Sequence, residues 1–133
     1  MRILKGKPVV DGVAEGFALV SKTRLNLLSD VDKEKGIIIK EKHELYGESL
    51  KDKILVFPSG VGTVGLSTII YTLKKNGVGP KALINQELET TTVFGALLAE
   101  IPMVAELEED PIKVIKTGDL VRVDGTNGTV TIL

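Results

Sequence analysis

The sequence contains no cysteine and one histidine, His43, among its 133 residues. Without cysteine there are no disulfides, no thiolate nucleophile, and no thiolate ligands for an iron–sulfur cluster or a structural zinc ion. A lone histidine does not build a metal site, and His43 lies in the charged run 40–44, which is typical of a solvated loop. We therefore expect that this chain holds no metal and that His43 is not catalytic.

A strong charge imbalance is also missing, since 17 basic residues stand against 18 acidic ones and the net charge is −1. This balance gives no field that would attract nucleic acid or an anionic membrane. The longest hydrophobic runs fall far short of the roughly 20 residues that a membrane span needs. The N-terminus also lacks the apolar segment and cleavage site of a signal peptide. We expect a soluble, cytoplasmic protein that binds neither nucleic acid nor membrane.

Aromatic residues are scarce, at 4% of the chain, whereas hydrophobic residues of all kinds reach 43%. The core must therefore be built from Val, Ile, Leu and Ala. The chain is long enough to bury such a core, and no linker, repeat or low-complexity segment divides it. The sequence predicts a single domain over residues 1–133.

The stretch 53–77 organises the rest of the chain. Residues 54–57 form a short apolar run, typical of a strand buried on both faces, and residues 58–65 follow as a loop with three glycines. The next apolar residues recur at the spacing of one helix face: Leu66, Ile69, Ile70 and Leu73. Asn76-Gly77 ends the predicted helix, because glycine adopts the left-handed conformation easily.

A strand, a glycine loop and a helix N-terminus together can bind an anion. The loop exposes backbone N–H groups, and the helix dipole adds about half a positive charge. The loop is not a P-loop, because no Gly-Lys-Ser/Thr follows it. Gly60, Gly62 and Gly65 match the dinucleotide-binding spacing, but no acidic residue ends a second strand about 20 residues on. The alternative is a tight strand-to-helix turn that binds nothing.

The middle of the chain predicts a β-α-β-α-β unit. Residues 82–84 form the second strand, a helix through residues 93–100 follows, and residues 103–105 form the third strand. A threonine hydroxyl within 90–92 is expected to cap the second helix. Because the crossovers are right-handed, the strands are expected to be parallel, with the loops after them at one edge.

Short β segments are predicted on both sides of this unit, at residues 7–12, 15–21, 37–39, 117–125 and 129–133. Asn127-Gly128 is a hairpin turn signal between the last two. Residues 23–32 are compatible with a loop or a single helical turn, and residues 110–116 are ambiguous. The predicted fold class is α/β, with a β-rich, barrel-like shell around the β-α-β-α-β middle.

Seven short motifs then occur together in order: Gly12–Gly16, Leu45–Ser49, Pro58–Gly62, Ala82–Asn85, Gly95-Ala96, Ile101-Pro102 and Thr117–Asp119. In this order the chain resembles the small subunit, or swivel domain, of the aconitase X family from Lys5 to the C-terminus. The resemblance implies a swivelling β/β/α fold, which agrees with the pattern of strands and helices.

The resemblance also implies an activity. Family members are hydro-lyases that remove water from a hydroxy acid, and the substrate expected here is 5-phosphomevalonate in a modified mevalonate route to isoprenoids. It implies a heterodimer in which the large subunit holds a 4Fe–4S cluster and the small subunit, inactive alone, brings a proton-abstracting hydroxyl. A cis-3-hydroxyproline-type dehydratase and a non-catalytic binding or regulatory module of the same fold are the alternatives.

Matching the family's glycine loop residue by residue implies two catalytic candidates, Thr63 and then Ser67. The expected binding residues for a small anionic hydroxy acid are Ser59, Gly60, Gly62 and Asn85. The loop departs from the family pattern at three positions, with Val61 for an arginine, Thr63 for a serine and Leu66 for a glycine. A substrate anion therefore needs a charge partner other than residue 61.

Overall fold

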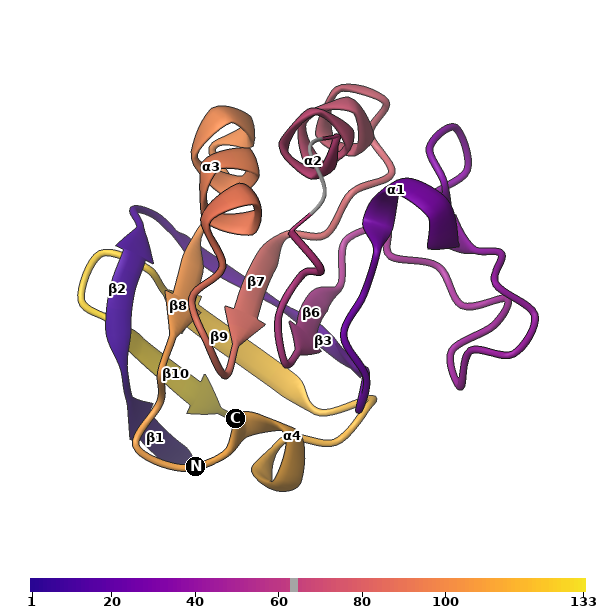
Figure 1. Ribbon diagram of the computed structural model, residues 1–133. Coiled ribbons are helices and arrows are strands. Elements are labelled where there is room, and N and C mark those ends of the chain that lie inside the picture. The colour runs from indigo at the N-terminus through magenta and orange to yellow at the C-terminus, as the bar shows by residue number, and fades with distance from the viewer. Residues whose placement is uncertain (63–64) are drawn as a thin grey trace.

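The computed structural model describes residues 1–62 and 65–133. The elements follow one another in this order: β1 (Arg2–Lys5), β2 (Lys7–Val10), β3 (Val13–Val20), α1 (Leu27–Asp30), β4 (Val31–Asp32), β5 (Ile37–Ile38), β6 (Ile54–Phe57), α2 (Leu66–Lys75), β7 (Ala82–Asn85), α3 (Thr90–Ala99), β8 (Met103–Ala105), α4 (Pro111–Val114), β9 (Leu120–Asp124) and β10 (Thr129–Ile132). Helices α2 and α3 lie side by side over one face of the sheet (Figure 1).

Eight strands form one sheet in the order β1-β10-β9-β3-β6-β7-β8-β2. The pairs β3–β6, β6–β7 and β7–β8 are parallel, and the remaining pairs are antiparallel. The two edge strands are consecutive in the chain and are joined by Gly6, whose N–H donates to the Gly128 carbonyl at 2.8 Å. The curved sheet thus turns back on itself, which confirms the predicted shell around a β-α-β-α-β middle.

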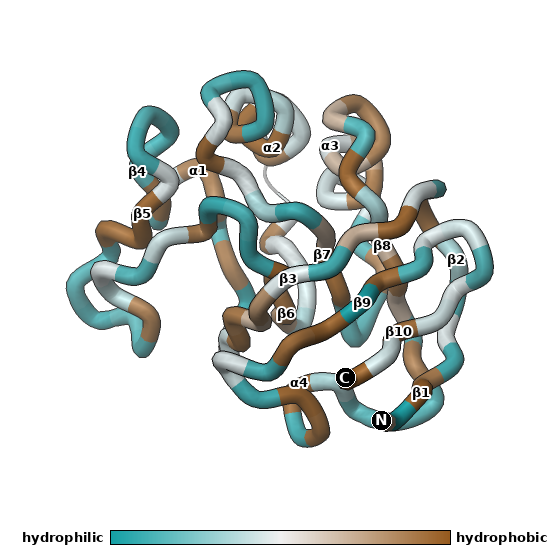
Figure 2. Tube along the Cα trace, turned by 180° about the vertical axis from the view of Figure 1, so that it is seen from behind, coloured by the Kyte–Doolittle hydropathy of each residue, from teal (hydrophilic) through white to brown (hydrophobic). Residues whose placement is uncertain are grey.

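Strand β6 is buried on both faces because it separates two hydrophobic cores. Leu55 and Phe57 belong to the core beneath the helices, which also contains the inner face of α2. Ile54 and Val56 belong to the core inside the shell, which holds side chains from β7, β8, β9 and β10. Figure 2 shows hydrophobic colour along the central strands and hydrophilic colour on the turn between β4 and β5. The apolar run 54–57 is therefore confirmed as a doubly buried strand.

The two long helices pack unusually closely where they cross. A Cβ added to Gly95 of α3 would lie 2.9 Å from the Ser67 Cα and 2.8 Å from the Ile70 Cδ1 of α2. The predicted face of α2 is confirmed, since its apolar residues are buried, and the helix ends at Asn76 before Gly77 with φ +71°. The prediction of a threonine cap for α3 is wrong, because the Glu89 carboxylate caps this helix.

Several local features differ from the sequence-based expectation. Strand β1 was not predicted, although it closes the shell by pairing with β10. Of the two alternatives for segment 23–32, the structure shows the single helical turn, α1, in which the buried Asp30 accepts the Asn26 N–H at 3.1 Å. The ambiguous segment 110–116 contains the short helix α4, capped by Asp110.

None of the helices in the described ranges combines the length and the hydrophobicity that crossing a bilayer would require.

Candidate active site

The glycine loop leaves β6 at the edge where β7 also ends. The Pro58 carbonyl accepts the N–H groups of Gln86 and Glu87 at 3.1 and 3.2 Å, so the turns after these two parallel strands are joined. On the other side of the loop, the Ser59 carbonyl accepts the Leu25 N–H at 3.2 Å. The expectation that residues 59 onward and 85–87 share one edge is confirmed for the part of the loop that the structure describes.

Arg24 places a guanidinium directly on this loop. Its Nε donates to the Ser59 Oγ at 3.1 Å, and its Nη2 donates to the Gly60 carbonyl at 3.0 Å. Ser59 is buried, and its own hydroxyl also donates to the Gly60 carbonyl at 2.9 Å. Arg24 thus brings the positive charge that Val61 does not supply. Sequence reasoning missed it because Arg24 and Ser59 are 35 residues apart and no motif connects them.

The loop packs against the start of α3 at Gly60. A Cβ at this position would lie 2.2 Å from the Thr92 Oγ1, 2.6 Å from the Leu66 Cδ2 and 2.9 Å from the Glu89 Oε1. A side chain has no room here, so glycine is needed for space. Gly62 differs, since it is exposed and takes φ +74°, a conformation that glycine adopts without strain.

Glu89 is a second functional candidate that sequence reasoning missed. Its carboxylate accepts the N–H groups of Thr91 and Thr92 at 2.8 and 3.0 Å, and both threonine hydroxyls donate to it as well. Partial burial raises the pKa of Glu89, but the hydrogen bonds from Thr92 and Thr91 outweigh burial and hold the pKa below its usual range. A carboxylate that stays ionised at neutral pH therefore lies beside Gly60 and Gly62.

Asn85 ends β7 and is completely buried. Its Nδ2 donates to the carbonyls of Phe57 and Ile84 at 3.1 and 3.2 Å, which ties the ends of β6 and β7 together. Within the described ranges its Oδ1 has no hydrogen-bond partner. The predicted binding residue thus lies at the expected edge with one acceptor left open, but its side chain does not reach the solvent.

Of the two catalytic candidates, Thr63 and Ser67, the structure describes only Ser67; Thr63 lies outside the described residues. Ser67 lies in the first turn of α2, where it is half-buried and its Cα faces Gly95. Gly65 precedes this helix and provides no side-chain cap, so among the residues that the structure describes the first N–H groups of α2 have no capping side chain as acceptor. A helix start of this kind favours an anionic ligand.

His43 is half-buried and is held by hydrogen bonds to its neighbours. Its Nδ1 accepts the Leu45 N–H at 2.9 Å, so in the neutral ring Nε2 carries the proton and donates to the Thr23 Oγ1 at 3.2 Å. The ring therefore fixes the loop 40–44 against residues 21–23. Lys40, Glu41, Lys42 and Glu44 are exposed, which agrees with the expected solvated loop, and only His43 within it is half-buried.

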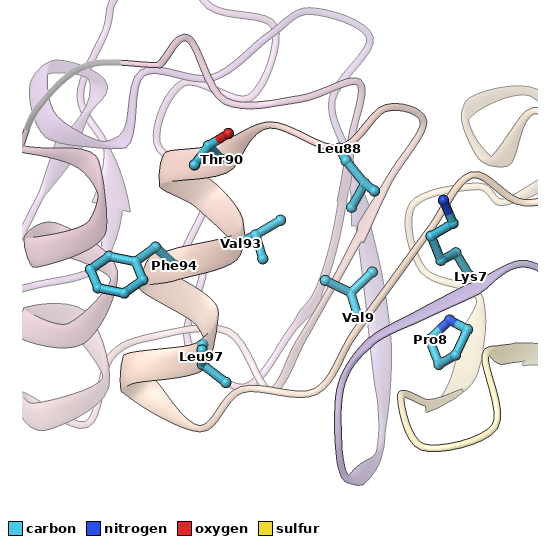
Figure 3. Close-up of a pocket in the computed structure, with 8 residues that line it drawn as sticks. All are labelled: Lys7, Pro8, Val9, Leu88, Thr90, Val93, Phe94 and Leu97. Carbon is cyan, nitrogen blue, oxygen red and sulfur yellow. The ribbon is translucent and has the colours of Figure 1, made fainter.

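A separate hollow of about 450 Å³ lies between β2 and α3 (Figure 3). Val93 and Leu97 of α3 face Val9 across it. Its one charged lining residue, Lys7, pairs with Glu106 at 3.3 Å. Apart from the ion-paired Lys7, the lining is hydrophobic or neutral, so this hollow is not the candidate catalytic centre.

No group of three or more His, Cys, Asp or Glu side chains suited to a metal ion occurs among residues 1–62 and 65–133.

Comparisons with known proteins agree over nearly the whole chain. The family model described as the aconitase X swivel domain matches residues 3–132. The chain is 44% identical over 130 residues to a protein of Methanosarcina acetivorans named phosphomevalonate dehydratase small subunit, covering 98% of this chain and 90% of that one. A protein of the same name from Thermococcus kodakarensis is 45% identical, with 98% of this chain and 96% of that one covered.

Among solved structures, the crystal structure of holo-form aconitase X from Thermococcus kodakaraensis matches with a TM-score of 0.94 at 44% identity. The match covers 100% of this chain and 99% of that one. The shell, the parallel middle and the two covering helices are therefore shared with that protein.

Proposed function

This chain belongs to the aconitase X swivel-domain family, and from this premise we propose that it dehydrates (R)-5-phosphomevalonate to trans-anhydromevalonate 5-phosphate together with a large subunit. The observation that carries the proposal is the identity of about 44% over nearly the full chain to small subunits named for this dehydratase. The chain is accordingly the small subunit of a hydro-lyase in the modified mevalonate pathway to isoprenoids.

The chemistry explains why such an enzyme needs two parts. Dehydration beside a carboxylate requires a base for the α-proton and a Lewis acid for the departing hydroxyl. This chain contains no cysteine, so a 4Fe–4S cluster, which would supply the Lewis acid, would be ligated by the large subunit. We infer that this chain contributes the base and part of the substrate-binding surface.

Thr63 is our candidate for that base, with Ser67 as the second choice. A free hydroxyl is a poor base, and it becomes effective only where positive charge stabilises the alkoxide. Two such sources flank the segment in which Thr63 lies, namely the Arg24 guanidinium on Gly60 and the start of α2, where Gly65 supplies no capping side chain. These features support a hydroxyl base at this place in the chain.

The proposed function is tested by reconstituting the chain with the large subunit of the same source and adding 5-phosphomevalonate. Turnover is expected only with both subunits, and cis-3-hydroxyproline, offered separately, is expected to remain unchanged. Turnover by this chain alone would disprove the divided site, and dehydration of hydroxyproline alone would replace the substrate assignment.

The choice of base is tested in the same assay with Thr63→Ala, Thr63→Ser and Ser67→Ala. Removing a general base typically lowers the rate by about 10²- to 10⁴-fold, so Thr63→Ala should lose turnover while Thr63→Ser retains it. Near-normal turnover in Thr63→Ala with a collapse in Ser67→Ala would move the assignment to Ser67. Near-normal turnover in both would place the base on the large subunit.

A further inference from the structure

A basic hollow lies next to the glycine loop and has no role in the function argued above. It measures about 480 Å³ and is lined by Thr23, Arg24, Lys40, Lys42, His43 and Glu44. Three of these residues are permanent cations at neutral pH and one is a carboxylate. The hollow thus has a positive balance, although the whole chain carries a net charge of −1.

The cations of this hollow are available to a ligand. The three ion pairs found among residues 1–62 and 65–133 join Arg2 to Glu109, Lys7 to Glu106 and Arg122 to Glu15, and none of them involves the hollow. The one acidic lining residue, Glu44, is already engaged, since its carboxylate accepts the Lys22 N–H. The lysine side chains of the hollow therefore have no carboxylate partner within these ranges.

Arg24 connects the hollow to the glycine loop. Its two hydrogen bonds to Ser59 and Gly60 use two of the five N–H groups of a guanidinium. The same side chain also lines the hollow. A ligand in the hollow would therefore lie within reach of the loop, and one small molecule with two anionic ends could contact both.

The shape of the hollow is maintained by the rigid contacts of His43. With Nδ1 accepting the Leu45 N–H and Nε2 donating to the Thr23 hydroxyl, the ring links the two chain segments that carry Arg24 and the lysines. The backbone segments that carry Arg24, Lys40 and Lys42 are thereby held beside each other.

We propose that this hollow binds the phosphate group of a phosphorylated hydroxy acid, while the glycine loop holds the end of the molecule that reacts. The inference rests on the proposed function, because it assigns the two ends of that substrate. A phosphate monoester carries about −1.5 to −2 charges at neutral pH. The planar guanidinium of Arg24, with its N–H donors, and the ammonium groups of Lys40 and Lys42 are suitable partners for such a group.

The first test is kinetic and uses the reconstituted two-subunit enzyme. Lys40→Gln combined with Lys42→Gln is expected to raise the KM for 5-phosphomevalonate by about 10- to 100-fold and to leave kcat almost unchanged, because the charges act on a remote part of the substrate. The matched control is Lys113→Gln combined with Lys116→Gln, which removes two exposed lysines at and just after α4. An unchanged KM in the first variant, or an equal rise in the control, would overturn the inference.

The second test does not depend on turnover. Inorganic phosphate is titrated into the isolated chain at constant ionic strength, and backbone amide shifts are followed by NMR. Shifts at residues 23–24 and 40–44 that the double lysine variant abolishes would support the hollow. Shifts confined to residues 60–67, or none at either place, would overturn it.

The two tests separate this inference from the proposed function. If the wild-type pair does not dehydrate 5-phosphomevalonate, the proposed function fails, and the phosphate titration still reports on the hollow. If the pair is active but the lysine variant is normal in KM, the function stands and the phosphate site lies elsewhere.

Discussion

Replacing Glu89 by glutamine should destabilise both the start of α3 and the packing of the glycine loop against it. The wild-type carboxylate accepts two backbone N–H groups and the hydroxyls of Thr91 and Thr92. Glutamine keeps one oxygen, but its amide NH₂ places donors where donors already point. Either the buried Thr92 hydroxyl or the Thr91 N–H, whichever then faces the NH₂ group, would be left without its acceptor.

The magnitude follows from these contacts. Loss of an N-cap costs about 0.5–2 kcal/mol, and an unsatisfied buried hydroxyl adds about 1 kcal/mol or more. Glu89 is partly exposed, so solvent screening keeps the total in the lower part of this range. We expect Glu89→Gln to lower the free energy of unfolding by about 1.5–2 kcal/mol at pH 7.

The sign of the pH dependence is also determined. The pKa of Glu89 is lowered by folding from its ordinary value of 4.5, so its contribution is fully present above that value. It is lost as the pH falls through the lower pKa of the folded state. The stability difference between wild type and Glu89→Gln should therefore shrink in acid, whereas the lowered pKa values of Asp32 and Asp124 act equally in both proteins.

Urea denaturation at pH 7 and at a series of values below 4.5 measures both effects. The matched control is Glu87→Gln, which makes the same charge change at an exposed position two residues earlier. Equal stability of the two variants at pH 7 would refute the capping role. A difference that grows as the pH falls would refute the assignment of the lowered pKa.

Three further predictions concern other contacts. Gly60→Ala should lower the free energy of unfolding by about 1–3 kcal/mol through overpacking and abolish turnover of the reconstituted enzyme. The control is Gly118→Ala, at a position where φ is +97° and nothing lies within 4 Å of the added Cβ; it should lower the free energy of unfolding by about 1–2 kcal/mol and leave turnover normal. Gly95→Ala should separate α2 from α3 and lower the unfolding midpoint in urea, and an unchanged midpoint would contradict the close packing. Asn85→Asp should destabilise by about 3 kcal/mol or more at pH 7, since a buried carboxylate would face two carbonyls. Its carboxyl pKa would be raised, so the deficit should shrink as the pH falls, and a constant deficit would argue against burial.

Local patterns were enough to predict the framework of the site. The doubly buried strand at 54–57, the helix face beginning at Leu66 and the stop at Asn76-Gly77 all depend on residues within one or two turns of each other. The chain order of strands and helices, with right-handed crossovers, then brought the ends of β6 and β7 to one edge. The sequence pattern thus predicts the edge at which Pro58 and Ser59 of the glycine loop lie.

The tertiary structure decided which groups surround that loop. Arg24 meets Ser59 from 35 positions away, and no periodicity or motif encodes that pairing. Glu89 reaches Gly60 only because α3 starts beside the end of β6, and the same packing determines that a Cβ at Gly60 would collide with Thr92. The electrostatic surroundings of a side chain depend on such contacts between residues distant in sequence, whereas hydrophobic periodicity depends only on the spacing of neighbouring residues. The sequence alone therefore determined the strands and helices of the scaffold, and the tertiary structure determined which charged groups lie beside the glycine loop.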